Sequence, residues 1–292
     1  MPIAGRTFFT LATPAAVGDR VRAGSVPHVY ETVELERRGA AAIIRLDRPE
    51  ALNAWNATLG DELLHAVREV AGDDDVRAVC VTGAGRAFSS GADLRDMASR
   101  GLTEDGKLDV YTTLTTVYNP ILTGLRRMPK PVVAALNGPA VGIGCSLALA
   151  CDLLVAAPSA YLSLAFARIG LVPDGGSLAF VSARAGGGRA AEMAMLGGRV
   201  TATEALACGL VDEVLADDEL DAGVAARLDA LAAGPTAAYA GVKRQLNAWL
   251  YSGLDAQLEL EARIQQEMAA SGDFAEGVAA FLEKRDPEFR GA

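Results

Sequence analysis

The 292-residue chain is predicted to adopt an α/β fold. Short apolar runs of strand length alternate, in its first half, with longer segments whose apolar residues recur at helical spacing. Short loops rich in glycine and proline join these segments, and the resulting strand–helix–strand order is typical of α/β proteins. Hydrophobic residues make up 51% of the chain, which is enough to bury a large core.

The predicted elements follow one another closely between residues 40 and 158. The strands are expected at residues 40–46, 78–83, 130–138 and 152–158. The helices are expected at residues 58–71, 107–127 and 142–151. The loop between the first strand and the first helix reads "DRPEALNAWN".

The pattern changes after residue 200, where strands become rare. Thr201 and Glu204 have the spacing of a capping box, and residues 217–285 read as helical throughout. We predict that the final helix begins at Asp273, with Glu276 completing its N-terminal cap. These changes suggest a core at residues 29–216 and a helical region at 217–292.

Residues 1–28 show neither clean periodicity nor the long apolar stretch of a secretion signal. We interpret them as a loosely ordered extension. Elsewhere, every apolar run of membrane-spanning length is interrupted by polar residues. The sequence therefore predicts a cytoplasmic protein with no membrane partner.

Charge and composition exclude several classes of function. The net charge is −10, whereas phosphate backbones are bound by clustered Lys and Arg, so no nucleic-acid partner is expected. The four cysteines lie in apolar segments without a CxxC pair, which indicates reduced core residues. With only two histidines in the chain, we expect neither a Ser-His-Asp mechanism nor a zinc site.

Two glycine-rich loops, "SSGAD" (89–93) and "GPAVGIGCS" (138–146), lie at predicted strand–helix junctions. Such junctions leave backbone N–H groups unpaired, and two of them facing one point would form an oxyanion hole. Glycines at these junctions also serve simply to ease packing. A dinucleotide fingerprint is disfavoured, because "GAGRAF" carries Phe88 where the third glycine is needed.

Asp174 lies in "PDGG", which on its own is a good β-turn sequence. A turn carboxylate and an acid–base group are both open interpretations at this point. The two roles are compatible, because a tight turn also aims the side chain.

Several motifs appear in the order found in one known family. They are "RPEALNAW", "FSSGADL", "NGPAVGIGCSLALACDL", "GLVPDGGS" and "TATEALACGLVDEV". The chain thus resembles the enoyl-CoA hydratase/isomerase, or crotonase, superfamily over residues 29–292. "LAFARIGLVPDGG" and "GPTAAYAGVK" are most similar to the phenylacetate-pathway isomerases. The resemblance implies a spiral of ββα units, a C-terminal trimerisation region, and a trimer or a dimer of trimers.

The same resemblance implies a site. The oxyanion donors fall on the amides of Ala92 and Ile143, and the base of certain isomerase branches falls on Asp174. The two glutamates of a hydratase fall on Ser146 and Phe166, so both are missing.

Further contacts to the acyl-CoA substrate are implied at eight positions. Ala54 corresponds to backbone that cups the adenine, Arg95 to a cation near the phosphates, and Phe281 and Lys284 to contacts from a neighbouring subunit. The remaining positions are Asp93, Leu94, Ser146 and Phe166, with Asp93 equally able to stabilise its loop.

These residues predict an acyl-CoA isomerase that shifts a double bond or isomerises epoxyphenylacetyl-CoA, in fatty acid metabolism or phenylacetate catabolism. Its single base would be Asp174, and coenzyme A would be part of the substrate, with no separate cofactor and no metal. An enoyl-CoA hydratase with an unusual water site remains an alternative, as does a non-catalytic acyl-CoA-binding homologue. A dehalogenase-like role with Asp174 as nucleophile ranks last, because no histidine lies near the "SSGAD" loop.

Overall fold

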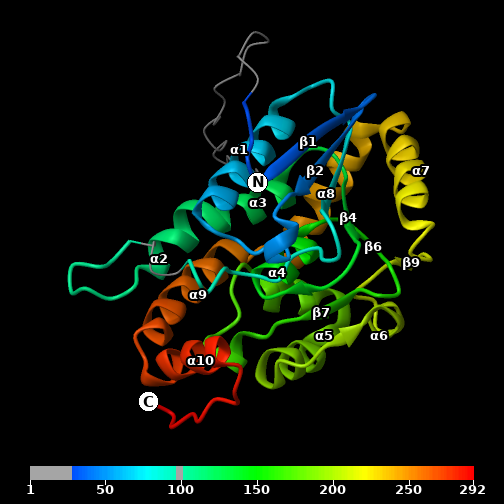
Figure 1. Ribbon diagram of the computed structural model, residues 1–292. Coiled ribbons are helices and arrows are strands. Elements are labelled where there is room, and N and C mark those ends of the chain that lie inside the picture. The colour runs from blue at the N-terminus through cyan, green and yellow to red at the C-terminus, as the bar shows by residue number, and fades with distance from the viewer. Residues whose placement is uncertain (1–27, 97–100) are drawn as a thin grey trace, which may run out of the picture.

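The computed structural model describes residues 28–96 and 101–292, so the predicted extension at 1–28 falls almost wholly outside the described residues. A six-stranded sheet runs through this part in the order β1-β2-β3-β4-β6-β9 (Figure 1). Only β1 and β2 pair antiparallel, and the other neighbours are parallel. The strands are β1 (Val33–Arg38), β2 (Ala41–Leu46), β3 (Ala78–Gly83), β4 (Val132–Leu136), β6 (Leu153–Ala156) and β9 (Glu213–Val214).

Helices cover both faces of this sheet, which explains why its central strands are apolar along their whole length. One core cluster packs α7 (Leu220–Ala233) against Cys80, Val133 and Val155. The larger cluster packs α1 (Ala57–Gly72), α3 (Asn119–Arg127) and α4 (Ile143–Ala150) on the other face.

A second, three-stranded sheet of order β5-β7-β8 lies beside the first. It contains β5 (Ala140–Val141), β7 (Tyr161–Ser163) and β8 (Val200–Thr201), with α5 (Ser177–Leu196) and α6 (Ala202–Ala207) in the same part of the chain. The predicted capping box of Thr201 and Glu204 is confirmed at the start of α6.

The predicted helix at 107–127 is broken into three parts. They are α2 (Val110–Thr113), a π-helical turn (Leu114–Tyr118) and α3. Pro120, the second residue of α3, has no N–H to donate to the preceding turn, so the helix widens before it.

The C-terminal helical region is α7, α8 (Thr236–Leu250), α9 (Leu254–Ala269) and α10 (Gly272–Glu283), as the sequence predicts. The predicted cap of the last helix was wrong. Ser271 caps α10 by accepting from Phe274 N, while Asp273 accepts from the backbone of Arg290 and Gly291. A hydroxyl two residues earlier thus takes the cap, and the carboxylate holds the C-terminal tail.

Several elements had no counterpart among the sequence predictions, namely the two- and three-residue strands β5, β7, β8 and β9, and the longer elements β1 and α5. In β1, only Val33 is fully buried, so the strand lacks a clear apolar alternation. In α5, the sequence "ARAGGGRAA" interrupts helical spacing, and the structure has a kink at Gly186. The boundary near residue 216 remains a prediction.

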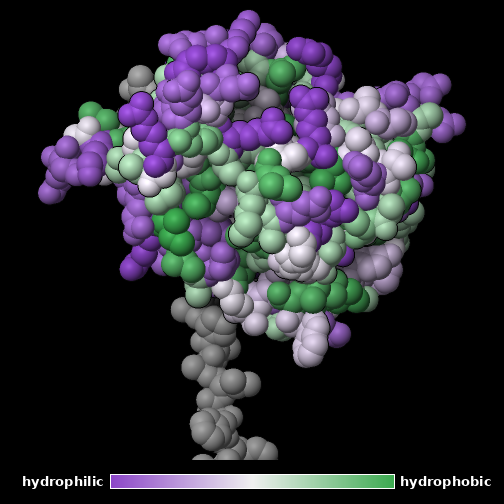
Figure 2. Space-filling model, turned by 90° about the horizontal axis from the view of Figure 1, so that it is seen from below, coloured by the Kyte–Doolittle hydropathy of each residue, from purple (hydrophilic) through white to green (hydrophobic). Residues whose placement is uncertain are grey.

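The outer surface is mixed in polarity. Figure 2 shows hydrophobic and hydrophilic residues interspersed over the face seen from below. Among the described helices, none is long and apolar enough to cross a membrane.

A buried ionic cluster joins the sheet to α3 and α8. The carboxylate of Asp152 binds Arg126 at 3.0 Å and Lys243 at 2.7 Å, and both cationic side chains are only 5–6% exposed. The same carboxylate accepts from Val132 N at the start of β4. Because Asp152 directly precedes β6, its carboxylate links the starts of β4 and β6.

We expect Asp152→Ala to lower the free energy of unfolding by about 3–5 kcal/mol, because it leaves two buried cations without their partner. The control is Asp255→Ala, which removes the exposed partner of Arg127 and is expected to cost about 1 kcal/mol or less. Urea denaturation at fixed protein concentration measures both, and equal losses would contradict this role of Asp152.

Candidate active site

The loop that precedes α1 is held by a buried asparagine. Asn53 accepts from Arg48 N through Oδ1 and donates through Nδ2 to the carbonyls of Ala84 and Ala87. Its own carbonyl accepts from Ser89 Oγ at 2.8 Å. Asn53 therefore fixes the "SSGAD" loop against the loop after β2.

The amide of Ala92 points away from Trp55, the residue with which Ala92 forms an isolated parallel bridge. Trp55 N donates to Gly91 O at 2.8 Å, and Asp93 N donates to Trp55 O at 3.0 Å. Because backbone groups alternate in direction along an extended chain, the Ala92 N–H between them faces the opposite side.

The amide of Ile143 lies at the start of α4, the second predicted donor position. Ile143 is the first residue of this helix and Gly142 is its N-cap, so the Ile143 N–H has no acceptor within the helix. The N-terminal end of a helix also favours negative charge.

Two glycines bring the donor loops together. Gly91 has φ +97°, and a Cβ built on it would lie 2.9 Å from Val141 O and 3.7 Å from Gly142 Cα. Gly142 has φ +55° and faces Gly91 in turn. The backbones preceding Ala92 and Ile143 are thus in direct contact, a closeness that only residues without a side chain permit.

Asp174 lies buried beside this pair, with 5% of its surface exposed. Ser146 Oγ donates to Asp174 O at 2.9 Å, which ties the turn to α4. A Cβ on the next residue, Gly175, would lie 2.8 Å from Ile143 Cδ1. The structure therefore packs the turn that carries Asp174 against the first turn of α4, where Ile143 lies.

Helix α9 contributes two residues that the sequence reasoning missed. Gln265 donates to Asp174 Oδ2 at 2.9 Å and accepts from Val172 N at 3.1 Å. Glu261 accepts from Gly176 N at 2.8 Å and from Gln257, and burial raises the pKa of its carboxyl group. The helical spacing of the residues that α9 buries could be read from the sequence. That spacing does not indicate that two of them form hydrogen bonds with residues 172–176.

Ser146 and Phe166 occupy the predicted glutamate positions, and neither side chain is acidic. Both are buried. A Cβ on Gly142 would lie 3.8 Å from Phe166 Cζ, so the phenyl ring lies against the residue that precedes Ile143.

The other residues predicted to contact acyl-CoA lie in two places, the loop around Ala54 and Asp93 and the end of α10. Arg48 donates to Ala54 O at 2.6 Å and to the carboxylate of Asp93 at 3.2 Å, so the Asp93 side chain stabilises its own loop. Leu94 is partly buried beyond this loop and Arg95 is exposed. Phe281, 56% exposed, and Lys284 lie at the carboxyl end of α10.

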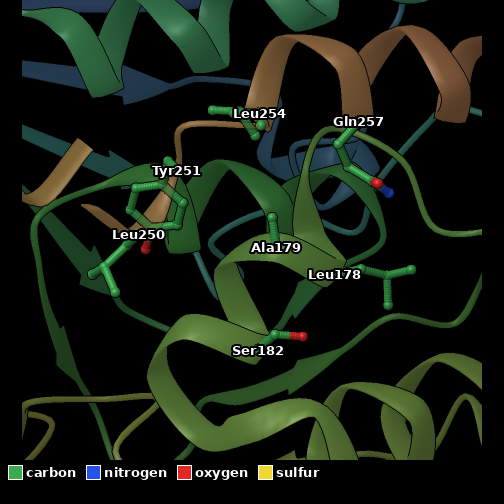
Figure 3. A pocket seen from close by; sticks show the side chains of 8 residues that line it. Leu178, Ala179, Ser182, Leu250, Tyr251, Leu254 and Gln257 are labelled. Carbon is green, nitrogen blue, oxygen red and sulfur yellow. The ribbon is translucent and has the colours of Figure 1, made fainter. Parts of the chain in front are cut away.

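A cavity of about 400 Å³ opens between the first turns of α5 and the α8–α9 junction (Figure 3). Leu178, Ala179, Tyr251, Leu254 and Gln257 are among its lining residues. None of the predicted site residues lines it. Across residues 28–96 and 101–292, no group of three or more His, Cys, Asp or Glu is placed to hold a metal ion.

Comparison with known proteins gives consistent matches. Residues 36–292 match a family described as enoyl-CoA hydratase/isomerase. A probable enoyl-CoA hydratase of Rhodobacter capsulatus is 45% identical, over 90% of this chain and 99% of its own. The 1,2-epoxyphenylacetyl-CoA isomerase of Escherichia coli is 39% identical, over 85% of this chain and 94% of its own.

Solved structures agree with these relatives. The crystal structure of an enoyl-CoA hydratase from Mycobacterium avium subsp. paratuberculosis has a TM-score of 0.81 and 35% identity to this chain. The match covers 90% of this chain and all of that structure. The crotonase fold expected from the sequence motifs is confirmed.

The contact between the two donor loops predicts a steep steric penalty. Gly91→Ala is expected to cost about 2 kcal/mol or more of stability, because it adds backbone strain and a clash with Val141. Gly39→Ala is the control, since Gly39 also has a positive φ but has open space around it, and we expect about 1 kcal/mol there. Denaturation of both variants is the measurement, and a smaller loss at Gly91 would contradict the close approach.

Proposed function

Because this chain belongs to the enoyl-CoA hydratase/isomerase family, we propose that it isomerises acyl-CoA thioesters with Asp174 as its only acid–base group. The family acts on CoA thioesters, and the proposal concerns which reaction this member performs. The observation that carries it is the burial of Asp174 in a turn that packs on α4 near Ile143, with Ser146 and Phe166 at the positions where the sequence resemblance places the hydratase glutamates.

In the proposed reaction, the thioester oxygen accepts hydrogen bonds from the amides of Ala92 and Ile143. Asp174 removes a proton from the carbon α or γ to the thioester, and the electron pair moves onto that oxygen as a dienolate. The protonated Asp174 then returns the proton at the other end of the conjugated system, so the double bond shifts and no atom is gained or lost.

The oxyanion donors and the base are each expected to lower the reaction barrier substantially. An oxyanion donor is typically worth about 2.7–4 kcal/mol of barrier, and general acid–base transfer about 10²–10⁴-fold in rate. The base removes a proton that the thioester already acidifies, and the donors stabilise the anion that results. A ring epoxide next to a thioester CH₂, the substrate type named for the Escherichia coli relative, fits the same parts.

A hydratase is the second candidate, because the Rhodobacter capsulatus relative at 45% identity is named a probable hydratase. Adding water across a double bond needs one group to activate water and another to move the α proton. Asp174 could supply one of these roles, whereas Ser146 and Phe166 supply no second carboxylate.

Crotonyl-CoA hydration, followed by loss of absorbance of the conjugated thioester, separates the two candidates. We expect turnover at least about 100-fold slower than double-bond migration in a β,γ-unsaturated thioester, since one acid–base partner is missing. Hydration as fast as migration would favour the hydratase.

The base is tested by Asp174→Asn, which keeps the size of the side chain and removes its proton acceptor. In deuterated water we expect deuterium uptake at the α and γ carbons of a CoA thioester to fall by at least about 100-fold. Thioester binding, measured by calorimetry, should persist. Undiminished uptake, read by mass spectrometry over a panel of thioesters, would rule the mechanism out.

The proposed enzyme uses no cofactor beyond the coenzyme A of its substrate. Its expected assembly, a trimer or a dimer of trimers in which Phe281 and Lys284 reach a neighbour's substrate, stays a prediction. The exposure of both residues is compatible with that role.

A further inference from the structure

We propose that Gln265 of α9 is a positioning residue that aims the carboxylate of Asp174. This inference rests on the proposed function, in which Asp174 is the base. It concerns a side chain 91 positions further along the chain, in the C-terminal helical region.

The contacts of Gln265 are specific and directional. Its Nε2 donates to Asp174 Oδ2 at 2.9 Å, and its Oε1 accepts from Val172 N at 3.1 Å. The side chain is only 1% exposed, so few alternative partners in solvent compete for these bonds. One amide group therefore holds both the backbone that leads into the turn and the carboxylate at its apex.

The far end of the turn is held by the same helix face. Glu261, one turn before Gln265, accepts from Gly176 N at 2.8 Å, and its other oxygen accepts from Gln257 Nε2. Together with Ser146, which binds Asp174 O from α4, these residues hold the segment 172–176 on both sides. Gln265 contacts a carboxylate oxygen of Asp174, whereas the bonds of Ser146 and Glu261 go to backbone atoms of the turn.

Placement matters because proton transfer requires the base within hydrogen-bond reach of the acidic C–H. An error of about 1 Å in such geometry can cost about 100-fold in rate. A free aspartate would rotate about two side-chain bonds, and the amide of Gln265 selects among these orientations.

Two variants separate the two hydrogen bonds of Gln265. Gln265→Met keeps the length of the side chain and removes both bonds. Gln265→Glu keeps an acceptor for Val172 N but replaces the donor to Asp174 with an oxygen. If Gln265 only braced the backbone, Gln265→Glu would retain activity, whereas an aiming role requires that both variants lose it.

Gln266→Met is the matched control. Gln266 is the next residue of α9, and its amide binds the backbone of Val110, Tyr111 and Leu108 rather than the Asp174 turn. Gln266→Met therefore removes three side-chain to backbone bonds from the same helix and leaves the Asp174 turn untouched.

The experiment measures deuterium uptake into 3-hexenoyl-CoA by the full chain, together with thioester binding and thermal unfolding. We expect both Gln265 variants to lower kcat by about 10- to 100-fold, the usual worth of a hydrogen bond to a charged group, with KM changed by less than about threefold. Gln266→Met should keep kcat within about twofold of the unaltered protein.

The possible failures are distinct. Unchanged kcat in Gln265→Glu, or an equal loss in Gln266→Met, would overturn the aiming role while leaving Asp174 as the base. Absence of uptake by the unaltered protein, or undiminished uptake in Asp174→Asn, would overturn the proposed function and this inference with it.

Discussion

The proposed site depends on close packing at two glycines, Gly91 and Gly175. Gly91 meets the segment containing Val141 and Gly142, and Gly175 meets the first turn of α4. A side chain at Gly91 or Gly175 would push these segments apart, and with them the amides and the carboxylate that the proposed reaction uses. The strands and helices behind them, closed by the ionic cluster around Asp152, hold this contact in place.

This arrangement explains why the chemistry is carried by so few side chains. Two of the three groups used in the proposed reaction are backbone amides, which no substitution at Ala92 or Ile143 other than proline removes. The third is Asp174, whose turn is bound by Ser146 on one side and by α9 on the other. Ser146 thus occupies a position where hydratases carry a glutamate and uses it to hold the base of the proposed reaction.

Sequence alone predicted the alternating core and the residues of the site loops, because strand length, helical spacing and glycine at junctions are local signals. It missed β1 and α5, whose patterns are weakened by charged residues and by a run of glycines. It placed the cap of α10 at Asp273, where a carboxylate and the hydroxyl of Ser271 were both possible. Gln265 and Gln266 look alike in sequence, and only the tertiary packing of α9 shows which one reaches Asp174.

The most direct measurement is a crystal structure of the protein with an unreactive CoA thioester. The account predicts the thioester oxygen about 2.7–3.1 Å from the amide nitrogens of both Ala92 and Ile143. It also predicts an oxygen of Asp174 about 3–3.5 Å from the α or γ carbon of the acyl chain. A thioester bound elsewhere, with its oxygen on neither amide and its acyl chain out of reach of Asp174, would contradict it.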